Sequence, residues 1–214
     1  SNLLLLKRLG KTRKPILLSS GMSSFEELET SIVFLRKFGN PLTIMQCTSK
    51  YPTGPKDWGL NVIQELKNRF ELPVGFSDHS GTIYASLAAA VMGAEVFEFH
   101  VVFDKRQFGP DVSSSITIDQ VKILTEGIKA IQTAMNNPLN KNNISQCEDL
   151  KKMFGKSLSV NKNKKAGEII KFEDLESKKP SEYGISAIEF EKVIGKTLNK
   201  NLAKWSFLNW EDLD

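Results

Sequence analysis

The chain contains only two histidines, and each lies at the end of an apolar stretch typical of a β-strand. His79 follows Val74-Gly75-Phe76-Ser77-Asp78, and His100 follows Val96-Phe97-Glu98-Phe99. Active sites of parallel α/β folds are usually built at strand ends, and two imidazoles from consecutive strands could bind one divalent metal ion. Alternatively, each is a hydrogen-bonded histidine with a structural role. The histidines alone leave both interpretations open.

Side chains with hydroxyl groups occur at comparable positions. The motifs that carry them, with one acidic motif after His100, are Leu18-Ser19-Ser20-Gly21, Gln46-Cys47-Thr48-Ser49-Lys50-Tyr51, Gly75-Phe76-Ser77-Asp78-His79 and Phe108-Gly109-Pro110-Asp111. Hydroxyl groups on tight turns suit phosphate binding because they add donors to nearby backbone N–H groups. Each serine alone would be interpreted as a helix N-cap, but the recurrence in successive strand ends favours a binding site.

Four successive segments read as a strand followed by a helix. The expected pairs are strand 14–19 with helix 24–38, strand 42–47 with helix 61–66, strand 74–76 with helix 84–91, and strand 96–102 with helix 117–134. Ser24 and Glu27 have the spacing of a capping box at the start of the first helix. Repeated β-then-α units predict parallel strands with right-handed crossovers. Both histidines, Ser19, Thr48 and Ser77 would then gather at the carboxyl edge of one sheet.

The last third of the chain has a different character. Residues 136–146 are rich in Asn, Lys and Pro, which is typical of a linker. The segment 153–214 contains a faint repeat, because Phe172-Glu173-Asp174-Leu175 recurs as Trp210-Glu211-Asp212-Leu213. We therefore predict a sheet-containing domain over 1–137, a linker over 138–152 and a small, mostly β module over 153–214. About 60 residues give a marginal core, so this module is expected to pack against a partner.

Composition limits the remaining possibilities. With 214 residues, 40% hydrophobic and 25% charged, the chain is typical of a globular protein. It has no apolar run near the roughly 20 residues that span a bilayer, and its start has the reverse charge order of a signal peptide, which predicts a cytoplasmic protein without a membrane partner. The net charge is only +4 and the lysines are dispersed, so a nucleic-acid partner is not expected. Cys47 and Cys147 form no CxxC motif.

Taken together, the four motifs resemble the sialic acid synthase family, which makes N-acetylneuraminate, legionaminate or pseudaminate and includes spore coat polysaccharide biosynthesis proteins. The resemblance covers essentially the whole chain, and the Ser-Asp-His signature followed by a second histidine and Gly-Pro-Asp is its most specific part. The C-terminal module resembles that family's antifreeze-like (SAF, β-clip) domain, with Lys178-Lys179-Pro180 at its usual turn. The implied fold is the C-terminal half of a TIM (β/α)₈ barrel followed by a SAF-like domain.

The resemblance implies an activity and a set of site residues. Family members condense phosphoenolpyruvate with an N-acylated mannosamine-type sugar and release phosphate, and a Mn²⁺ or Mg²⁺ ion polarises the sugar aldehyde. The residues that match are His79 and His100 as catalytic metal ligands, Ser19 and Ser77 as phosphate-binding hydroxyls, Tyr51 and Asp111 as sugar contacts, Ser49 as a phosphate or carboxylate contact, and Lys179 as a contact to the sugar of a partner subunit.

Three positions depart from the family pattern. Ser49 replaces an asparagine found in many members, so its contact would be shortened or bridged by water. Phe99 stands where many members carry Lys or Arg before the second histidine. Lys179 stands where an arginine is frequent, and a lysine supplies a point charge without the bidentate fork of a guanidinium.

Residues 1–140 supply four β/α units, whereas a closed barrel needs eight and about 250 residues. The first four family strands, including an Asn-His-Asn-Gly region, have no counterpart, so we expect this chain to correspond to the C-terminal part of a synthase. A half barrel exposes two sheet edges, which predicts self-association, and the family implies a homodimer through the SAF-like module. The alternatives are a sugar-binding or assembly module without turnover, and a structural SAF-type dimerisation protein.

Overall fold

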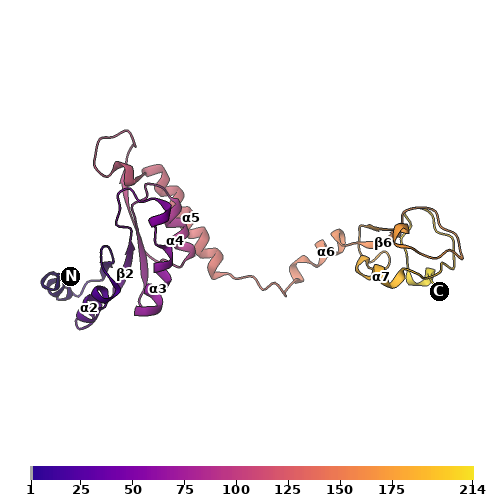
Figure 1. The fold of residues 1–214 in the computed structure, drawn as a ribbon, viewed down its shortest axis with the longest axis horizontal. Coiled ribbons are helices and arrows are strands. Elements are labelled where there is room, and N and C mark those ends of the chain that lie inside the picture. The colour runs from indigo at the N-terminus through magenta and orange to yellow at the C-terminus, as the bar shows by residue number, and fades with distance from the viewer. Residues whose placement is uncertain (1) are drawn as a thin grey trace. The chain divides into compact units, whose positions relative to one another are not determined.

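The computed structural model describes residues 2–214 and contains two compact units (Figure 1). The first unit extends to Pro138, and the second comprises Leu139–Asp214. Each unit has its own hydrophobic core and is described here separately. No helix among residues 2–214 has the length and apolar character needed to cross a membrane.

The first unit is built on a five-stranded, fully parallel sheet. Its strands are β1 Ile16–Ser19, β2 Leu42–Cys47, β3 Val74–Asp78, β4 Phe97–Val102 and β5 Ser115–Thr117, and they pair in chain order. Parallel neighbours require a connection back to the starting end of the sheet, and helices provide it after β1, β2 and β3. The α/β alternation predicted from the sequence is confirmed.

Among the described residues, five α-helices belong to this unit. They are α1 Leu3–Gly10, α2 Phe25–Arg36, α3 Leu60–Phe70, α4 Tyr84–Val91 and α5 Ile118–Asn136. Reciprocal capping boxes begin two of them, Ser24 with Glu27 at α2 and Thr117 with Gln120 at α5. Two elements were not expected, α1 and the three-residue strand β5, which directly precedes α5.

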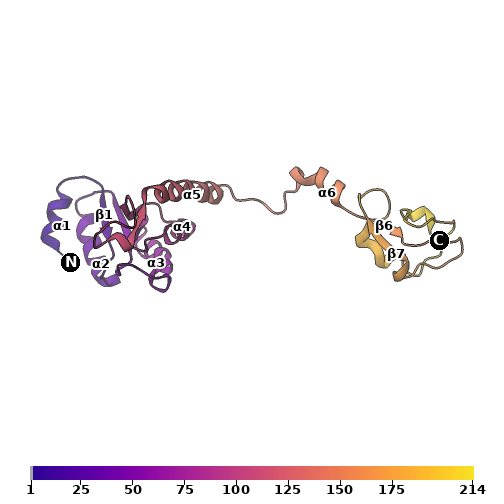
Figure 2. The same cartoon turned by 90° about the horizontal axis from the view of Figure 1, so that it is seen from above.

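The core lies between the sheet and its helices (Figure 2). It is formed by Ile16, Ile44, Val74 and Phe76 from the strands and by Leu28, Ile32, Leu35, Ile63 and Leu66 from the helices. Side chains alternate between the two faces of a strand, so Leu17, Ser77 and His100 belong to the opposite face. Leu17 is 54% exposed on that face.

Strand β1 forms one edge of the sheet among the described residues. Its Ile16 N–H donates to the carbonyl of Pro41, and the Ser20 N–H just beyond it donates to Met45. Because backbone groups alternate in direction along a strand, the N–H groups of Leu17 and Ser19 face away from β2. This edge can therefore accept a further strand.

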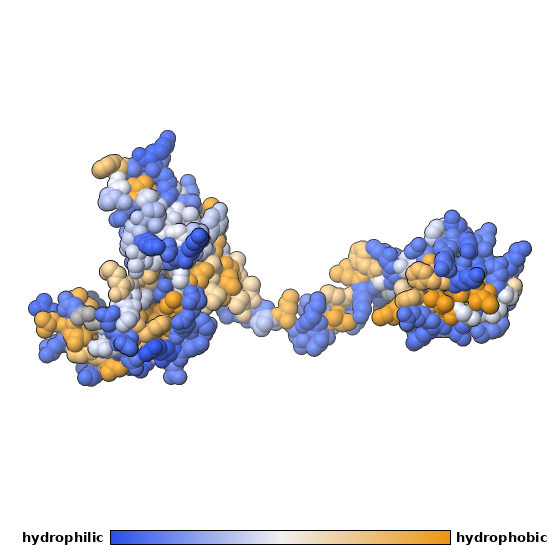
Figure 3. All heavy atoms as spheres, viewed as in Figure 1, coloured by the Kyte–Doolittle hydropathy of each residue, from blue (hydrophilic) through white to orange (hydrophobic). Residues whose placement is uncertain are grey.

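The second unit is small and irregular. Its regular elements are α6 Glu148–Phe154, the antiparallel pair β6 Ser157–Val160 and β7 Leu175–Lys178, and α7 Phe190–Val193. The core comprises Leu158, Val160, Ile170, Ile185, Val193, Leu198, Leu202 and Leu208. Helix α6 begins in 138–152, the range predicted to be a linker, and extends two residues beyond it, so part of that range is ordered as a helix. Figure 3 shows apolar residues on the surface of this unit among hydrophilic ones.

The faint sequence repeat corresponds to a repeated structure. Phe172–Asp174 and Trp210–Asp212 both form a single 3₁₀ turn with a buried aspartate. Asp174 accepts the backbone N–H of Lys171 at 3.1 Å, and Asp212 accepts that of Asn209 at 2.9 Å. The two tetrapeptides thus occupy equivalent places in two copies of one small motif.

The two aspartates differ in the lysines that contact them. Asp174 pairs with Lys162 at 2.6 Å and with the buried Lys164 at 2.9 Å, whereas Asp212 pairs with the exposed side chain of Lys200. Burial opposes ionisation of Asp174, but hydrogen bonds from both lysines outweigh it and hold the pKa of that carboxyl well below its usual range. Asp174 is therefore a carboxylate at neutral pH.

We expect Asp174→Asn to destabilise the second unit by about 2 kcal/mol at pH 7, because it leaves Lys164 buried with one carboxylate fewer. The matched control, Asp212→Asn, removes a pair with an exposed lysine and should cost about 1 kcal/mol or less. A lowered folded-state pKa stabilises the fold above the unfolded-state value of about 3.9, and this contribution is lost as the pH falls through the folded-state value.

The difference between wild type and Asp174→Asn should therefore be largest near neutrality and shrink below about pH 4. Fluorescence of Trp205 and Trp210 in a Trp58→Phe background reports unfolding of this unit alone. Equal losses for the two asparagine variants would contradict the assignment of Lys164 as the decisive partner.

Candidate active site

The two histidines lie next to each other at the carboxyl ends of β3 and β4. Their ring centroids are 5.1 Å apart, and Tyr51 packs against both rings, at 4.1 Å from His79 and edge-on at 5.9 Å from His100. Adjacent parallel strands bring their ends to the same edge of the sheet. The structure thus brings together three residues that the sequence placed in one site, His79, His100 and Tyr51.

The loop after β2 holds His79 on two sides. The hydroxyl Oγ1 of Thr48 lies 3.0 Å from Nδ1 of the ring, and the Thr53 N–H donates to the His79 carbonyl at 3.0 Å. His79 itself is 3% exposed. A ring packed against Tyr51 and bonded at one nitrogen has a defined orientation, as a metal ligand requires.

The turn that follows β3 is organised by Asp78. Its carboxylate accepts the Ser80 N–H at 2.7 Å and the hydroxyl of Ser86, from α4, at 2.9 Å. Both carboxylate oxygens are thereby engaged within the turn and the helix. The aspartate of the Ser-Asp-His motif fixes the backbone that carries His79 and does not itself face the neighbouring histidine as a ligand.

Asp111 lies near His100 on the loop between β4 and β5. Its Oδ2 atom is 3.8 Å from Nδ1 of His100. The loop is tethered by Lys105, whose ammonium donates to the carbonyls of Gly81, Val112 and Ser115. One side chain therefore joins the loop that carries Asp111 to the loop after His79.

Burial and neighbouring groups set the protonation of this site. Desolvation lowers the pKa of His79, and the adjacent His100 lowers it further. His79 is therefore neutral at physiological pH, which is the form that binds metals. Partial burial raises the pKa of Tyr51, and Cys47, Asp111 and Glu98 add to the effect, so its phenol stays protonated and can donate a hydrogen bond.

The residues present fit an open metal site. Within residues 2–214 no group of three or more His, Cys, Asp or Glu side chains is arranged to hold an ion. The imidazoles of His79 and His100 can supply two ligands, and water or substrate oxygens would complete the coordination of a first-row divalent ion. An incomplete protein ligand set is the arrangement that leaves positions for a substrate.

The predicted serines are placed differently from one another. Ser77 is buried in β3, where its register partners are Cys47 on β2 and Glu98 on β4. Ser19 ends β1, and its hydroxyl accepts the Gly21 N–H at 3.2 Å, which is a local turn contact. Ser49 is exposed and lines a cavity of about 300 Å³ next to the ends of β1 and β2.

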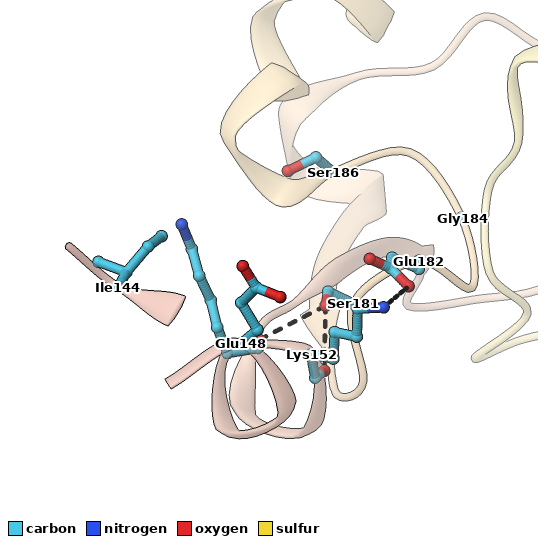
Figure 4. Close-up of a pocket in the computed structure, with 8 residues that line it drawn as sticks. Ile144, Glu148, Lys152, Ser181, Glu182, Gly184 and Ser186 are labelled. Atoms are coloured by element: carbon cyan, nitrogen blue, oxygen red, sulfur yellow. Dashed lines mark hydrogen bonds and ion pairs between the residues drawn. The ribbon is translucent and has the colours of Figure 1, made fainter. Parts of the chain in front are cut away.

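Lys179 belongs to the second unit, whereas the histidines belong to the first. Its ammonium lies over the ring of Phe154, 4.3 Å from the centroid. A cavity of about 470 Å³ opens in the same unit beside α6 (Figure 4). Two polar contacts join residues of its lining: Lys152 pairs with Glu182 at 3.7 Å, and the Ser181 hydroxyl donates to the Lys152 carbonyl at 3.0 Å.

Two residues at this site were not assigned a role from the sequence. Thr48 was recognised only as one of several hydroxyls at strand ends, and the adjacent Cys47 and Ser49 gave no reason to prefer it. Lys105 had no signal, because a single loop lysine that binds carbonyls does not differ in sequence from a solvated one.

The part of the chain that carries this site matches a known protein family. Residues 1–140 match the model of the NeuB family. The chain belongs to the NeuB family. This match confirms the family resemblance seen in the sequence. The matched range contains both histidines, Tyr51 and Asp111.

Curated relatives carry related names. This NeuB chain is 38% identical over 204 residues to the N,N'-diacetyllegionaminic acid synthase of Campylobacter jejuni, covering 94% of this chain and 60% of the relative. It is 31% identical over 195 residues to a pseudaminic acid synthase of C. jejuni, covering 91% and 56%. The chain thus spans about 60% of the length of the curated relatives it matches.

Solved structures agree on the fold. An N-acetylneuraminic acid synthetase from Leptospira borgpetersenii superposes with a TM-score of 0.64 at 30% identity, over 70% of this chain and 53% of that one. A spore coat polysaccharide biosynthesis protein from Bacillus subtilis gives 0.60 at 24% identity, over 99% and 64%, which is a likeness of fold alone. The NeuB chain is therefore an α/β protein with a parallel sheet, and its fold is similar to that of these proteins.

Proposed function

We propose that this NeuB chain carries the metal- and sugar-binding half of a nonulosonic acid synthase, which condenses phosphoenolpyruvate with an N-acylmannosamine-type sugar. The observation that supports this most strongly is the pair of adjacent imidazoles beside Tyr51 at a strand-end site. Relatives named as legionaminic and pseudaminic acid synthases support the substrate class.

The proposed reaction balances with one water molecule. C3 of phosphoenolpyruvate forms a bond to the aldehyde carbon of the sugar, and the aldehyde oxygen takes up a proton. Water supplies the oxygen at C2, and phosphate leaves. A Mn²⁺ or Mg²⁺ ion bound by His79 and His100 supplies Lewis-acid polarisation of the aldehyde oxygen.

The remaining side chains position and stabilise the reactants. Tyr51, protonated, is suited to donate a hydrogen bond to the sugar, and Asp111 to accept one from a sugar hydroxyl. Ser77, Ser19 and Ser49 offer hydroxyls to the phosphate and carboxylate of phosphoenolpyruvate, with Ser77 nearest to His79 in sequence and strand. Fixed polar groups lower the barrier because they need no reorganisation during the reaction.

We further propose that the first unit is half of a (β/α)₈ barrel. The support is the open edge of β1, the exposed Leu17 on the face opposite the helices, and the share of the relatives that the chain spans. The second unit is proposed to be a SAF-like module that joins two copies into a homodimer, with Lys179 directed to a sugar of the partner. A cytoplasmic enzyme of carbohydrate biosynthesis fits this proposal.

The test joins the part of the C. jejuni N,N'-diacetyllegionaminic acid synthase that precedes its matched region to this chain. Phosphate release is measured with phosphoenolpyruvate, Mn²⁺ and, separately, N-acetylmannosamine, its 6-phosphate and a diacetamido trideoxy sugar. We expect release with at least one sugar, none when either substrate is omitted, and none with EDTA. Metal and sugar binding without release would instead favour a non-catalytic sugar-binding module.

A further inference from the structure

Thr48 is placed to control the chemistry of His79 without touching a substrate. It directly follows β2 and is 2% exposed. Its Oγ1 atom lies 3.0 Å from Nδ1 of His79, a hydrogen-bond distance in which either atom could be the donor. Which of them donates decides the tautomer of a neutral imidazole.

The neighbours of Thr48 decide the direction of this hydrogen bond. The carbonyl of Ser77 accepts the Thr48 N–H at 3.3 Å and also lies 3.4 Å from Oγ1, in donor geometry for the hydroxyl. A carbonyl oxygen can only accept, so a hydrogen bond between it and Thr48 uses the single hydroxyl proton. In that arrangement the hydroxyl oxygen accepts from Nδ1 of His79, which then carries the proton.

We propose that Thr48 is a positioning residue that holds His79 in the Nδ1–H tautomer and so reserves Nε2 for the metal ion. The inference depends on the metal site of the proposed function, not on turnover. His100 is held less closely by Asp111, whose Oδ2 atom lies 3.8 Å from its Nδ1 atom, beyond hydrogen-bond range. The site therefore pairs one tautomer-fixed imidazole with one that is less constrained.

The tautomer is measured first, in the metal-free 214-residue chain. Long-range ¹H–¹⁵N correlation spectra distinguish protonated from unprotonated ring nitrogens, and the chain has only two histidines. A His100→Gln variant assigns the signals. We expect His79 to be protonated at Nδ1 and not at Nε2. A His79 signal protonated at Nε2 would overturn the proposal without any variant being needed.

Mn²⁺ affinity is measured second, by isothermal titration of the same chain. Thr48→Val keeps the side-chain shape but removes the acceptor, and we expect it to weaken Mn²⁺ binding about 10-fold, the lower end of the range for residues behind a metal ligand. Thr48→Ser restores the hydroxyl and should bind within about 3-fold of wild type. Equal affinity for wild type and Thr48→Val would refute the role.

The two measurements separate the proposals. If the wild-type chain binds no Mn²⁺, the metal site of the proposed function fails, and the spectra still decide whether Thr48 fixes the ring. If the chain binds Mn²⁺ but the tautomer is reversed, the metal site stands and the role of Thr48 fails. Thermal unfolding of both threonine variants controls for loss of structure.

Discussion

Replacing His79 or His100 by alanine is expected to abolish Mn²⁺ binding to the chain. It should also abolish phosphate release by the chain joined to the preceding part of the C. jejuni synthase. Each change deletes one of two protein ligands, whereas the substrate oxygens cannot hold the ion alone. The affinity loss should be at least about 100-fold, above the 10- to 100-fold typical of residues behind the ligands. Isothermal titration and Mn²⁺ electron paramagnetic resonance measure it.

The control is Glu126→Gln, which changes an exposed charge on α5 and should leave affinity within about 2-fold of wild type. Mn²⁺ binding that survives in both histidine variants would show that the imidazole pair does not hold the ion. Loss in only one variant would assign the site to a single histidine with other ligands, contrary to the proposed geometry.

The second large effect is expected at the open edge of β1. Leu17→Pro removes the backbone N–H that faces away from β2 and leaves the Ile16 N–H bond to Pro41 in place. The chain should therefore keep its fold but fail to accept a further parallel strand. The part of the C. jejuni synthase that precedes its matched region is added to restore activity. Phosphate release should then fall at least about 10-fold relative to wild type, as expected for loss of strand pairing.

Leu17→Thr is the matched control, because it replaces the apolar side chain but retains the N–H group. Leu17→Thr should retain most of the phosphate release that the added part of the C. jejuni synthase restores, whereas Leu17→Pro should not. Circular dichroism and a Mn²⁺ titration of Leu17→Pro check that the histidine site remains intact. Full activity of the proline variant would mean that β1 is not the strand at which the barrel is completed.

Elements with a clear periodicity were predictable from the sequence. Strand β2 and helix α4 have the predicted bounds, and the capping box of Ser24 begins α2 as expected. Strand β5 was missed because three residues show no alternation, and its pairing with β4 depends on tertiary contacts. Helix α6 was missed because charged residues in a polar stretch resemble a linker until the module packs beside them.

The candidate site was predictable to the extent that it depends on strand ends. His79, His100 and Tyr51 meet because parallel strands end at one edge, a consequence of topology that follows from alternation alone. The role of Thr48 was not predictable, because it depends on the direction of one hydroxyl proton between Ser77 and an imidazole. Such directions are set by interatomic distances that no spacing in the sequence encodes.

The contacts that shape the histidine pair all come from a short stretch of the chain. Thr48, in the loop after β2, lies within hydrogen-bond distance of the His79 ring, and Asp78 accepts a hydrogen bond in the turn after β3. Lys105 donates from the loop that carries Asp111 to the loop after His79. Under the proposed function, ion binding would depend only on these local contacts, whereas turnover would require the assembled barrel. Affinity for the ion can therefore be measured on this chain separately from the rate of phosphate release.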